Sequence, residues 1–379
     1  MRIVSFTTLY PNTARPNFGV FVENRLRHLV ASRQVDLTVV APVRWPSREV
    51  PYRQLRHGIE ILHPRFFTIP GLGMYVAPFG LYLAGKRTLS KLLHQGRIDL
   101  IDAHYIYPDG VAATWIGRAL KIPVVMTARG TDINVLPDFR FPRALIRRAL
   151  ARADGLISVS AALKDRLLEL GAPSAKVRVL RNGVDLAQFH LMDCETARAK
   201  HQLRGPVLLS VGSLLMAKGH DLTIRALPLI PQATLVIVGE GADAITLRAM
   251  AEAVGVKHRV RFMGTLPHDQ LPDLYCAADV LVHASEREGM ANVVLEALAS
   301  GTPVVGSPIP GMDEVIAAPE AGRIMAERTP EAVAAAVNAL LAAPPSRTQT
   351  RAYAETFSWD ATTEGQLAFF KAILATHKR

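Results

Sequence analysis

Residues 280–305 read VLVHASEREGMANVVLEALASGTPVV. The first five residues form an apolar run typical of a buried strand, and residues 292–300 place apolar side chains at helical spacing. A second short apolar run follows at 303–305, after a Gly-Thr-Pro break. A strand, a helix and another strand in this order predict a parallel βαβ unit, with helices covering the faces of the sheet.

The same alternation continues in both directions from this segment. Strands are expected at 2–7, 36–41, 100–103, 123–127, 155–158 and 176–180, and again at 206–211, 234–238, 260–262, 280–284 and 303–305. Helices are expected at 22–31, 110–120, 141–151 and 161–170, and again at 221–229, 243–253, 271–277, 292–300 and 330–342. Short apolar strands between helices favour parallel sheets covered on both faces. We therefore predict an α/β fold with two doubly wound, Rossmann-like domains that face an interdomain cleft.

Stretches without a strand pattern set the expected domain boundaries. Residues 185–204 contain no such pattern, so the first domain is expected to span 1–185 and the second 186–355. A Pro/Ser-rich break precedes an amphipathic pattern, which predicts a final helix within 356–379. Ligands of such folds bind beyond the carboxyl ends of the strands, so the cleft between the domains is the expected site.

Charge divides the chain unevenly. Residues 1–185 contain 27 Lys and Arg against 13 Asp and Glu, whereas residues 186–379 contain 17 against 20. This asymmetry favours an anionic partner for the first half, either a membrane surface or a phosphate-rich substrate. The basic residues form no recognition helix and no RNA-binding signature, so no nucleic-acid partner is expected.

Cysteine content and apolar runs exclude other classes. The two cysteines, Cys194 and Cys276, cannot build a disulfide framework or a thiolate zinc site, and a reducing, cytoplasmic compartment is expected. No run reaches ~18 apolar residues and no signal-peptide pattern begins the chain, so no membrane span is expected. Residues 64–87 are rich in aromatics, Pro and Gly and end in two basic residues. We expect this segment to be irregular, and either to lie at a bilayer surface or to pack on its own domain.

The loop and helix of residues 280–305 carry the most specific chemistry. Glu288 and Gly289 lie between the expected strand and helix, where a glycine lets a ligand approach the backbone. The N–H groups of the first helical turn favour an anion such as a diphosphate. Asn292 and Glu296 are four residues apart and share a helix face. An isolated acid pair here is also typical of a capped surface helix, so both interpretations stay open.

This segment resembles the signature of a known family. Two glutamates separated by seven residues, before a helix that ends in Ala-x-Gly-x-Pro-Val-Val, resemble the retaining family-4 glycosyltransferases, which have the two-domain GT-B fold. Within that family the chain is similar to the bacterial surface-polysaccharide and teichuronic-acid type. The resemblance implies that Glu288 contacts the donor sugar and Glu296 the ribose. It implies backbone contacts to the donor at Gly289, Met290, Ala291 and Asn292, and a final helix, 356–379, that crosses back to the first domain.

Other loops of the second half agree with the resemblance. Residues 210–219, SVGSLLMAKG, resemble the diphosphate-binding loop of the family, and residues 238–241 resemble its Gly-acid-Gly turn. Lys218 would act as a point charge on the donor phosphates. Ser213 stands where many relatives have Arg, so one expected cation is missing. The donor-binding residues implied here are Gly212, Ser213, Lys218, Gly239 and Met263, the last in a segment where relatives pair the nucleobase with backbone groups.

The first half departs further from the family pattern. Arg129 stands where relatives have the His of a His-Gly-x-Asp motif near the donor sugar, which leaves the donor open. Its guanidinium could pair with a phosphate or a uronate carboxylate, and the alternative is an ion pair with Asp132. His104 ends a strand and resembles a stretch near the acceptor, although it could equally be a satisfied strand-end histidine. Gly19 lies in a loop that carries paired glycines in relatives, near the leaving phosphate.

Together these residues predict a retaining glycosyltransferase of surface-polysaccharide synthesis. It would move a sugar from a nucleotide-diphosphate sugar to a glycan acceptor, such as a polyprenyl-diphosphate-linked one, at the inner face of the cytoplasmic membrane. Catalytic roles are expected for Glu288, Lys218, Arg129 and His104. No metal ligand set is apparent, so metal-independent transfer without a cofactor is expected. A sugar-nucleotide epimerase of the same fold, or a non-catalytic nucleotide-sugar-binding protein, is the alternative; a dinucleotide dehydrogenase is disfavoured because no Gly-x-Gly-x-x-Gly follows the first strand.

Overall fold

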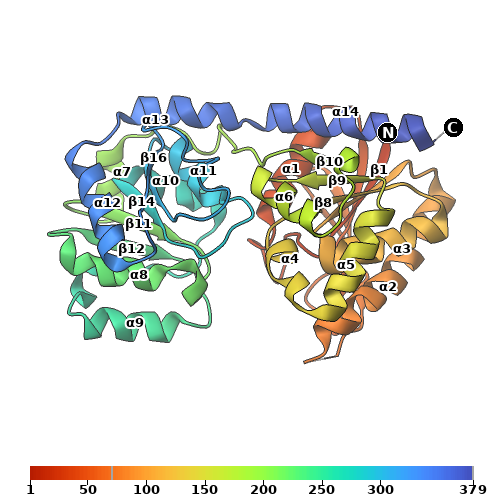
Figure 1. Ribbon diagram of the computed structural model, residues 1–379, viewed down its shortest axis with the longest axis horizontal. Coiled ribbons are helices and arrows are strands. Elements are labelled where there is room, and N and C mark those ends of the chain that lie inside the picture. The colour runs from red at the N-terminus through yellow and green to blue at the C-terminus, as the bar shows by residue number, and fades with distance from the viewer. Residues whose placement is uncertain (70, 378–379) are drawn as a thin grey trace. The chain divides into compact units, whose positions relative to one another are not determined.

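Two separate sheets organise the chain in the computed structural model, which describes residues 1–69 and 71–377. The contacts divide it into two compact units. The first contains Met1–Asn182 and the helix that begins at Trp359, and the second contains Gly183–Ser358. Each unit carries helices on both faces of its sheet (Figure 1). The predicted class, an α/β fold with two doubly wound units, is confirmed.

The sheet of the first unit has the order β10-β9-β8-β7-β1-β2-β5-β4, and every neighbouring pair is parallel except β4 with β5. From β1 the chain adds strands on one side, then returns and adds β7 to β10 on the other. The topological switch point, where such sheets bind ligands, therefore lies between β1 and β7. The strands are β1 (Arg2–Phe6), β2 (Asp36–Val40), β4 (Arg53–Arg56), β5 (Ile59–Leu62), β7 (Leu100–His104), β8 (Val124–Ala128), β9 (Gly155–Ser158) and β10 (Val177–Val179), with a separate parallel pair β3 (Val43–Arg44) and β6 (Arg65–Phe66).

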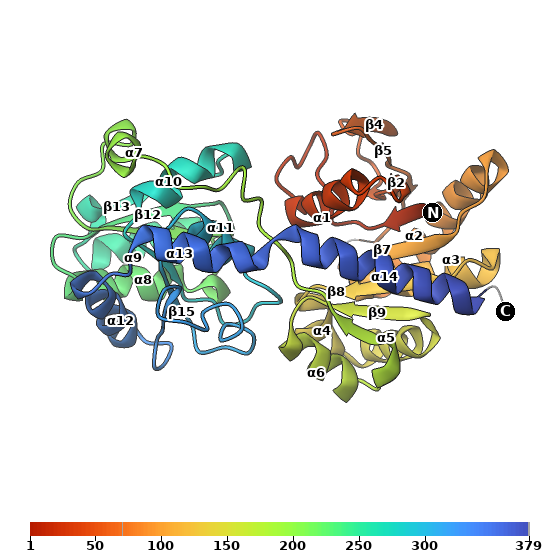
Figure 2. The ribbon, with the colours of Figure 1, turned by 90° about the horizontal axis from the view of Figure 1, so that it is seen from above.

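Helices from both ends of the chain cover one face of this sheet. Apolar side chains of α1 (Val20–Ala31) and α14 (Trp359–His377) share a core cluster with β1, β2, β7, β8 and β9. Figure 2 shows α14 lying across these strands. The other face is covered by α2 (Gly73–Gln95), α3 (Val111–Leu120) and α5 (Arg140–Arg152), while α4 (Thr131–Asn134) and α6 (Ala161–Glu169) follow β8 and β9.

The sheet of the second unit is entirely parallel, in the order β13-β12-β11-β14-β15-β16. Its switch point lies between β11 and β14. Successive residues point to opposite faces, so Leu208 belongs to one core cluster and Leu209 to the other. The strands are β11 (Val207–Val211), β12 (Thr234–Val238), β13 (Val260–Phe262), β14 (Val280–His283), β15 (Val304–Gly306) and β16 (Gly322–Ile324).

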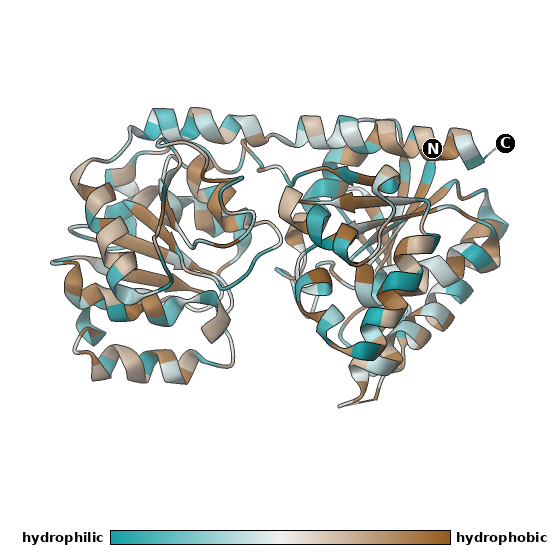
Figure 3. Cartoon of the chain, in the orientation of Figure 1, coloured by the Kyte–Doolittle hydropathy of each residue, from teal (hydrophilic) through white to brown (hydrophobic). Residues whose placement is uncertain are grey.

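Seven helices of the second unit bury apolar faces on this sheet. One face packs against α7 (Cys194–Lys200), α10 (Leu271–Ala277), α11 (Asn292–Ala299) and α13 (Arg347–Ala354). The other packs against α8 (His220–Ala226), α9 (Ala244–Ala253) and α12 (Pro330–Ala342). Figure 3 shows the apolar strands inside each unit and the hydrophilic residues concentrated on the helices and loops around them. Among the described residues, no helix is both long and apolar enough to span a bilayer.

One long helix was not predicted. Residues 64–87 were expected to be too irregular to span a bilayer, and α2, which begins at Gly73 and continues to Gln95, was not among the expected helices. Pro78 lies inside this helix, where its missing N–H leaves the carbonyl of Met74 without its helical donor. The hydroxyl of Tyr107 donates to that carbonyl instead. A side chain from a distant segment therefore makes Pro78 tolerable in α2, and the local sequence contains no sign of it.

Candidate functional site

Two loops meet at the switch point of the second sheet. One follows β11 and carries Lys218, and the other follows β14 and carries Glu288. The loops are joined at Ala217, whose carbonyl accepts hydrogen bonds from the backbone N–H of Glu286 at 2.8 Å and the hydroxyl of Ser285 at 3.3 Å. Because β11 and β14 are neighbours although about 70 residues separate them, the topology brings the two charged side chains together.

An ion pair links these loops. Lys218 Nζ donates to Glu288 Oε1 at 2.7 Å. His283, the last residue of β14, places its Nε2 3.1 Å from the same oxygen. Burial alone would raise the pKa of Glu288, but the hydrogen bond from His283 and the charges of His283 and Lys218 hold that pKa at about 2. The carboxylate is therefore ionised at any physiological pH.

The turn that presents Lys218 depends on a glycine. Gly219 has a φ of +71°, in the left-handed region that favours glycine. A Cβ at this position would lie 2.1 Å from the carbonyl oxygen of Ala284, directly after β14. A side chain here would push the Lys218 loop away from the loop that carries Glu288.

The helix after Glu288 begins without a side-chain cap from the residue that precedes it. Helix α11 starts at Asn292, and Ala291, which precedes it, supplies no side-chain cap. Ala291 is buried, while Gly289, Met290 and Asn292 are half-buried. First-turn N–H groups and the helix dipole favour a negative charge at such an end. Residues 289–292, where backbone contacts to the donor are predicted, thus directly follow Glu288 of the ion pair in the sequence.

Glu296 lies one turn into α11, and two side chains fix its carboxylate. His268 Nε2 lies 2.9 Å from Oε1, and the hydroxyl of Tyr275 donates to Oε2 at 2.8 Å. Burial would lower the pKa of His268, but the hydrogen bond and charge of Glu296 raise it above its ordinary value. The carboxylate is consequently oriented by α10 and the segment before it.

Two glycine turns line the same end of the sheet. Gly212 follows β11 and donates its N–H to the carbonyl of Val238 at 3.0 Å. Gly239 follows β12 and donates to the carbonyl of Gly264 at 2.8 Å. Met263 follows β13 and exposes 37% of its surface. Backbone hydrogen bonds therefore join the segments that follow these three neighbouring strands.

Ser213 is exposed, and a buried histidine orients its backbone. His220 Nε2 lies 3.2 Å from the carbonyl oxygen of Ser213, and Nδ1 lies 2.9 Å from the hydroxyl of Ser210. Burial lowers the pKa of His220 to about 4, so the ring is neutral at physiological pH. His220 was not predicted, since a histidine at the start of a helix has no distinguishing local pattern.

The predicted residues of the first unit surround its own switch point. Gly19 has a φ of +78° and directly precedes α1, which follows β1. His104 is the last residue of β7, and Arg129 follows β8. Because β1, β7 and β8 are consecutive strands of the sheet, these three residues lie at its carboxyl edge.

Arg129, His104 and Asp102 form a buried chain of contacts. Arg129 Nη2 donates to His104 Nδ1 at 2.8 Å, and His104 Nε2 lies 3.2 Å from Asp102 Oδ2. Since Nδ1 accepts, the ring proton is assigned to Nε2, facing the carboxylate. Burial, assisted by the charges of Arg129 and Arg25, lowers the pKa of His104 against the effect of Asp102. His104 is therefore neutral and polarised between a cation and an anion.

The guanidinium of Arg129 is not paired with Asp132. Arg129 Nη1 donates instead to Asn182 Oδ1 at 2.9 Å. Asp132 accepts backbone N–H groups from Arg129 at 3.1 Å, Gly130 at 2.8 Å and Ile106 at 2.7 Å. The alternative of a side-chain ion pair between Arg129 and Asp132 is therefore wrong, because the carboxylate is occupied by the main chain.

Two further polar residues connect this chain to α14. Arg25 of α1 is 1% exposed, and its Nε donates to Gln366 Oε1 at 2.7 Å. Gln366 Nε2 in turn donates to Asp102 Oδ2 at 3.0 Å. Sequence reasoning missed both residues, since an arginine or glutamine in an amphipathic helix is usually exposed. No local signal reveals that their partners come from the other end of the chain.

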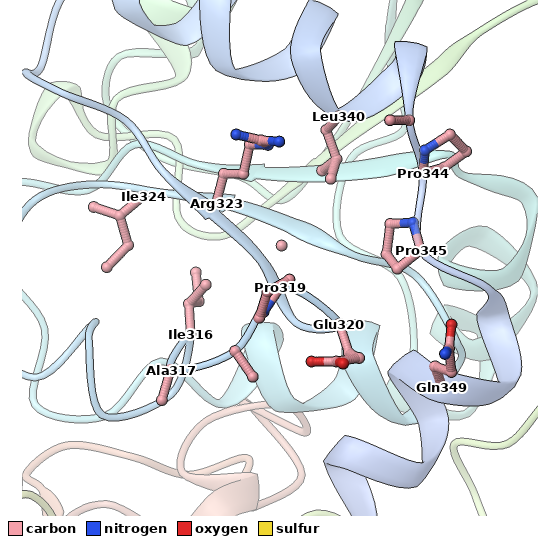
Figure 4. Close-up of a pocket in the computed structure, with 13 residues that line it drawn as sticks. Ile316, Ala317, Pro319, Glu320, Arg323, Ile324, Leu340, Pro344, Pro345 and Gln349 are labelled. Carbon is pink, nitrogen blue, oxygen red and sulfur yellow. The ribbon is translucent and has the colours of Figure 1, made fainter.

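The described residues contain no metal cluster, and one hollow of the second unit lies away from the predicted site residues. No group of three or more His, Cys, Asp or Glu side chains in 1–69 and 71–377 is arranged to hold a metal ion. A hollow of about 480 Å³ lies beside β16, α12 and α13, and Glu320 and Arg323 are its charged lining residues (Figure 4). None of the predicted site residues lines it.

Family models match both halves of the chain. Residues 193–357 match the model described as glycosyl transferases group 1, and residues 19–188 match glycosyltransferase family 4. A glycogen synthase of Mycobacterium tuberculosis is 38% identical over 381 residues, covering 93% of this chain and 89% of the relative. TuaC of Bacillus subtilis, assigned as a glycosyltransferase of teichuronic acid biosynthesis, is 29% identical over 338 residues, covering 83% of each chain.

Solved structures share the fold across nearly the whole chain. A sucrose-phosphate synthase from Thermosynechococcus elongatus superposes with a TM-score of 0.83 at 20% identity, covering 99% of both chains. Anabaena HepE in complex with UDP-glucose superposes with a TM-score of 0.77 at 18% identity, covering 98% of this chain and 99% of HepE. At these identities the likeness establishes the GT-B fold.

Proposed function

The chain belongs to the group 1 and family 4 glycosyltransferases, and from that premise we propose that it is a retaining enzyme that uses a nucleotide-diphosphate sugar. The acceptor we propose is a glycan, carried on a polyprenyl diphosphate. The observation that carries the donor assignment is the Lys218–Glu288 pair at the switch point of the second sheet. At this edge of the sheet, the Lys218 ammonium and the ionised Glu288 carboxylate lie in contact, and Glu288 shortly precedes the uncapped start of α11.

The groups at this edge suit the parts of a nucleotide-diphosphate sugar. Lys218 and the first-turn amides of α11 would neutralise the diphosphate as its charge grows during departure. Glu288 would accept hydrogen bonds from sugar hydroxyls, because it is ionised. Glu296, fixed by His268 and Tyr275, would accept ribose hydroxyls. The UDP-glucose complex of HepE, which shares the fold, supports the same class of donor.

The transfer we propose needs no protein nucleophile. The acceptor oxygen bonds to the anomeric carbon on the face from which the diphosphate leaves, and the acceptor proton passes to a departing diphosphate oxygen. The bond between the anomeric carbon and the diphosphate breaks in the same process, so configuration is retained. Glu288 stabilises positive charge on the sugar without bonding to it, and Lys218 stabilises the negative charge that develops on the leaving diphosphate. We propose that these groups suffice without a divalent metal ion.

The first unit would receive the acceptor. His104 and Arg129 lie at the carboxyl edge of its sheet, where the imidazole, engaged by Arg129 on one nitrogen and facing Asp102 with the other, would hold the guanidinium in position for an acceptor group. The charge excess of residues 1–185 supports an acceptor with a diphosphate group. The similarity to TuaC, assigned to teichuronic acid biosynthesis, supports a role in surface-polysaccharide synthesis.

A groove in the first unit supports attachment to an anionic membrane. It has a volume of about 580 Å³ and lies between β6 and α2. Arg65, Arg87 and Lys91 line it, and none of its described lining residues is acidic. Phe67 and Leu83 also line it and expose 62% and 67% of their surfaces. Cations beside exposed apolar side chains match an anionic lipid, so we propose that the enzyme works peripherally at the inner face of the cytoplasmic membrane.

The decisive experiment measures release of nucleoside diphosphate. The purified chain is incubated with a panel of UDP- and GDP-sugars, with and without membrane extracts that contain lipid-linked glycans, and with EDTA in a parallel series. We expect acceptor-dependent release from one donor, with EDTA without effect, and a product with the donor's anomeric configuration. Conversion of the sugar nucleotide without release would indicate an epimerase. Nucleotide binding with no turnover under any condition would indicate a binding protein.

A further inference from the structure

The two cysteines of the chain meet in the second unit. Cys194 and Cys276 are 82 positions apart in sequence, yet their Sγ atoms lie 3.4 Å apart. Both thiols are free. Cys194 is the half-buried first residue of α7, whereas Cys276 is buried in α10. The sulfur atoms of both residues meet each other and the carbonyl of Met192, so the function proposed above does not explain their approach.

Contacts that do not involve sulfur hold α7 against α10. Arg198 Nε donates to the carbonyl of Ala277 at 2.9 Å, and Arg198 Nη2 pairs with Asp279 Oδ1 at 2.6 Å. Lys200 pairs with Asp273, one helical turn before Ala277 in α10. The two sulfur atoms are therefore held close by their surroundings. An S–S bond of about 2.05 Å requires them to approach by roughly 1.4 Å.

We propose that Cys194 and Cys276 form a thiol–disulfide exchange site, which a low-molecular-weight disulfide converts reversibly into an intramolecular bond between α7 and α10. This inference is independent of the donor and acceptor assigned above. The bond would close residues 194–276 into a loop that contains β11, β12 and β13.

The chemistry has a fixed order of attack. Cys194 is reached first, as a thiolate, and bonds to one sulfur of the small disulfide while the other sulfur leaves as a thiolate. Cys276 then attacks the sulfur of Cys194, and the second small thiolate leaves. Two protein thiols are oxidised to one disulfide, the small disulfide is reduced to two thiols, and the two protein protons pass to the leaving thiolates. Burial, together with the neighbouring Cys194 thiol, raises the pKa of Cys276 to about 11, so it reacts poorly with external reagents. Its sulfur lies 3.4 Å from that of Cys194, and this proximity suits Cys276 to the second step.

The test uses the full chain and oxidised glutathione under native conditions. We expect the chain to lose both titratable thiols and two hydrogen atoms by mass, as a monomer, and to regain them with dithiothreitol. Cys276→Ser should stop at a glutathione adduct on Cys194, and Cys194→Ser should stay unmodified. If the buried serine prevents folding, Cys276→Ala provides the same arrest.

Several outcomes would overturn the proposal. One is that, under conditions in which Cys276→Ser becomes glutathionylated, the unmodified chain keeps both thiols. Another is that the unmodified chain itself stops at a stable glutathione adduct. It could also cross-link between molecules. We further expect the oxidised chain to melt several degrees above the reduced chain, because the bond restricts the unfolded state. An unchanged or lower melting temperature would show that closure strains α7 against α10, and that the reduced chain is not arranged for the bond.

Discussion

Lys218 links two loops through its ion pair with Glu288. Substitution of Lys218 tests the role of its positive charge separately from the other groups of the donor site. Lys218→Ala should lower kcat/KM by about 10²–10³-fold, because the developing diphosphate charge loses its cation. Folding should be little affected, since the Lys218 side chain is 31% exposed and Glu288 keeps its contact with His283. Steady-state kinetics at several donor concentrations, with melting curves, measure both effects.

Lys218→Arg is the matched control for this prediction. It keeps the charge at the same position, so it should retain more activity than Lys218→Ala. Turnover by Lys218→Ala equal to that of the unmodified enzyme, at both limiting and saturating donor, would place the diphosphate elsewhere.

Asp109 makes the first unit sensitive to pH. The residue is fully buried, and burial raises its pKa from 3.8 to about 8, although Thr8 donates two hydrogen bonds to Oδ2. The unfolded chain ionises this carboxyl near pH 4, so folding takes up a proton between about pH 4 and 8. The stability that depends on this proton is present at low pH and is lost as the pH rises, by at most about 1.4 kcal/mol per pH unit.

Asp109→Asn removes this titration while keeping an oxygen that can accept from Thr8. Relative to the variant, the unmodified chain should therefore lose stability from pH 5 to 8. Urea unfolding followed by tryptophan fluorescence measures the difference, because Trp45, Trp115 and Trp359 all belong to the first unit. Parallel stability profiles for the two chains would contradict the prediction.

Some site residues could be named from the sequence and others could not. Lys218 and Glu288 were accessible because each lies just beyond an apolar strand, and strand order decides which loops become neighbours. His283 was overlooked because it is the last residue of the core strand β14, where a side chain usually packs against the covering helices. Arg25 and Gln366 could not be predicted from local sequence, since they bond to each other although 341 positions separate them.

At the scale of elements, helix α2 shows why composition misled the local prediction. Gly and Pro are helix breakers in isolation, yet Pro78 and Gly80 of α2 are each accommodated by a neighbour. Gly80 lets α2 approach the chain beyond β6, because a Cβ there would lie 2.3 Å from the carbonyl oxygen of Phe67. Pro78 is tolerated through Tyr107. Most strands and most other helices were predictable because their apolar periodicity depends only on nearby residues, whereas the short strands β3 to β6 and β16 were not expected.

Helix α14 should contribute substantially to the free energy of unfolding of the first unit. Phe370 is fully buried and shares a core cluster with β1, β7 and α1. Phe370→Ala should destabilise this unit by about 3–5 kcal/mol, through lost burial and the cavity left behind. The exposed Glu364 of the same helix provides the control, since Glu364→Ala should change stability by less than about 0.5 kcal/mol.

Tryptophan fluorescence during urea unfolding separates the two cases. The transition of Phe370→Ala should move to lower urea, whereas that of Glu364→Ala should stay with the unmodified chain. A transition that is unchanged in Phe370→Ala would mean that α14 adds little to the folding of the unit on which it packs.

At the scale of the whole molecule, the uneven charge predicts reversible attachment to anionic vesicles. Each basic residue near such a surface contributes about 1 kcal/mol, and salt screens this term. Co-sedimentation should therefore show binding to anionic vesicles at low salt, less at high salt and little to neutral vesicles. Equal binding to both vesicle types would indicate that the charge serves another partner.

Matched charge reversals locate the attachment. Arg87→Glu combined with Lys91→Glu alters the groove beside α2 and should reduce vesicle binding by ten-fold or more. Arg204→Glu combined with Lys257→Glu changes the net charge equally but on the second unit, where both side chains are exposed. If both double variants lost binding alike, net charge alone would explain it, and the groove would have no special role.

The first unit is built from two separated pieces of chain, and this determines when it can fold during synthesis. A ribosome makes residues 1–182, then all of the second unit, and only then α14. At about 5–20 residues per second, residues 183–377 take roughly 10–40 s. Throughout that interval the nascent chain exposes the sheet face that Leu367, Phe370 and Ile373 later cover. The unit whose synthesis begins first therefore completes its folding last, and until then its open face is a surface on which a chaperone can act.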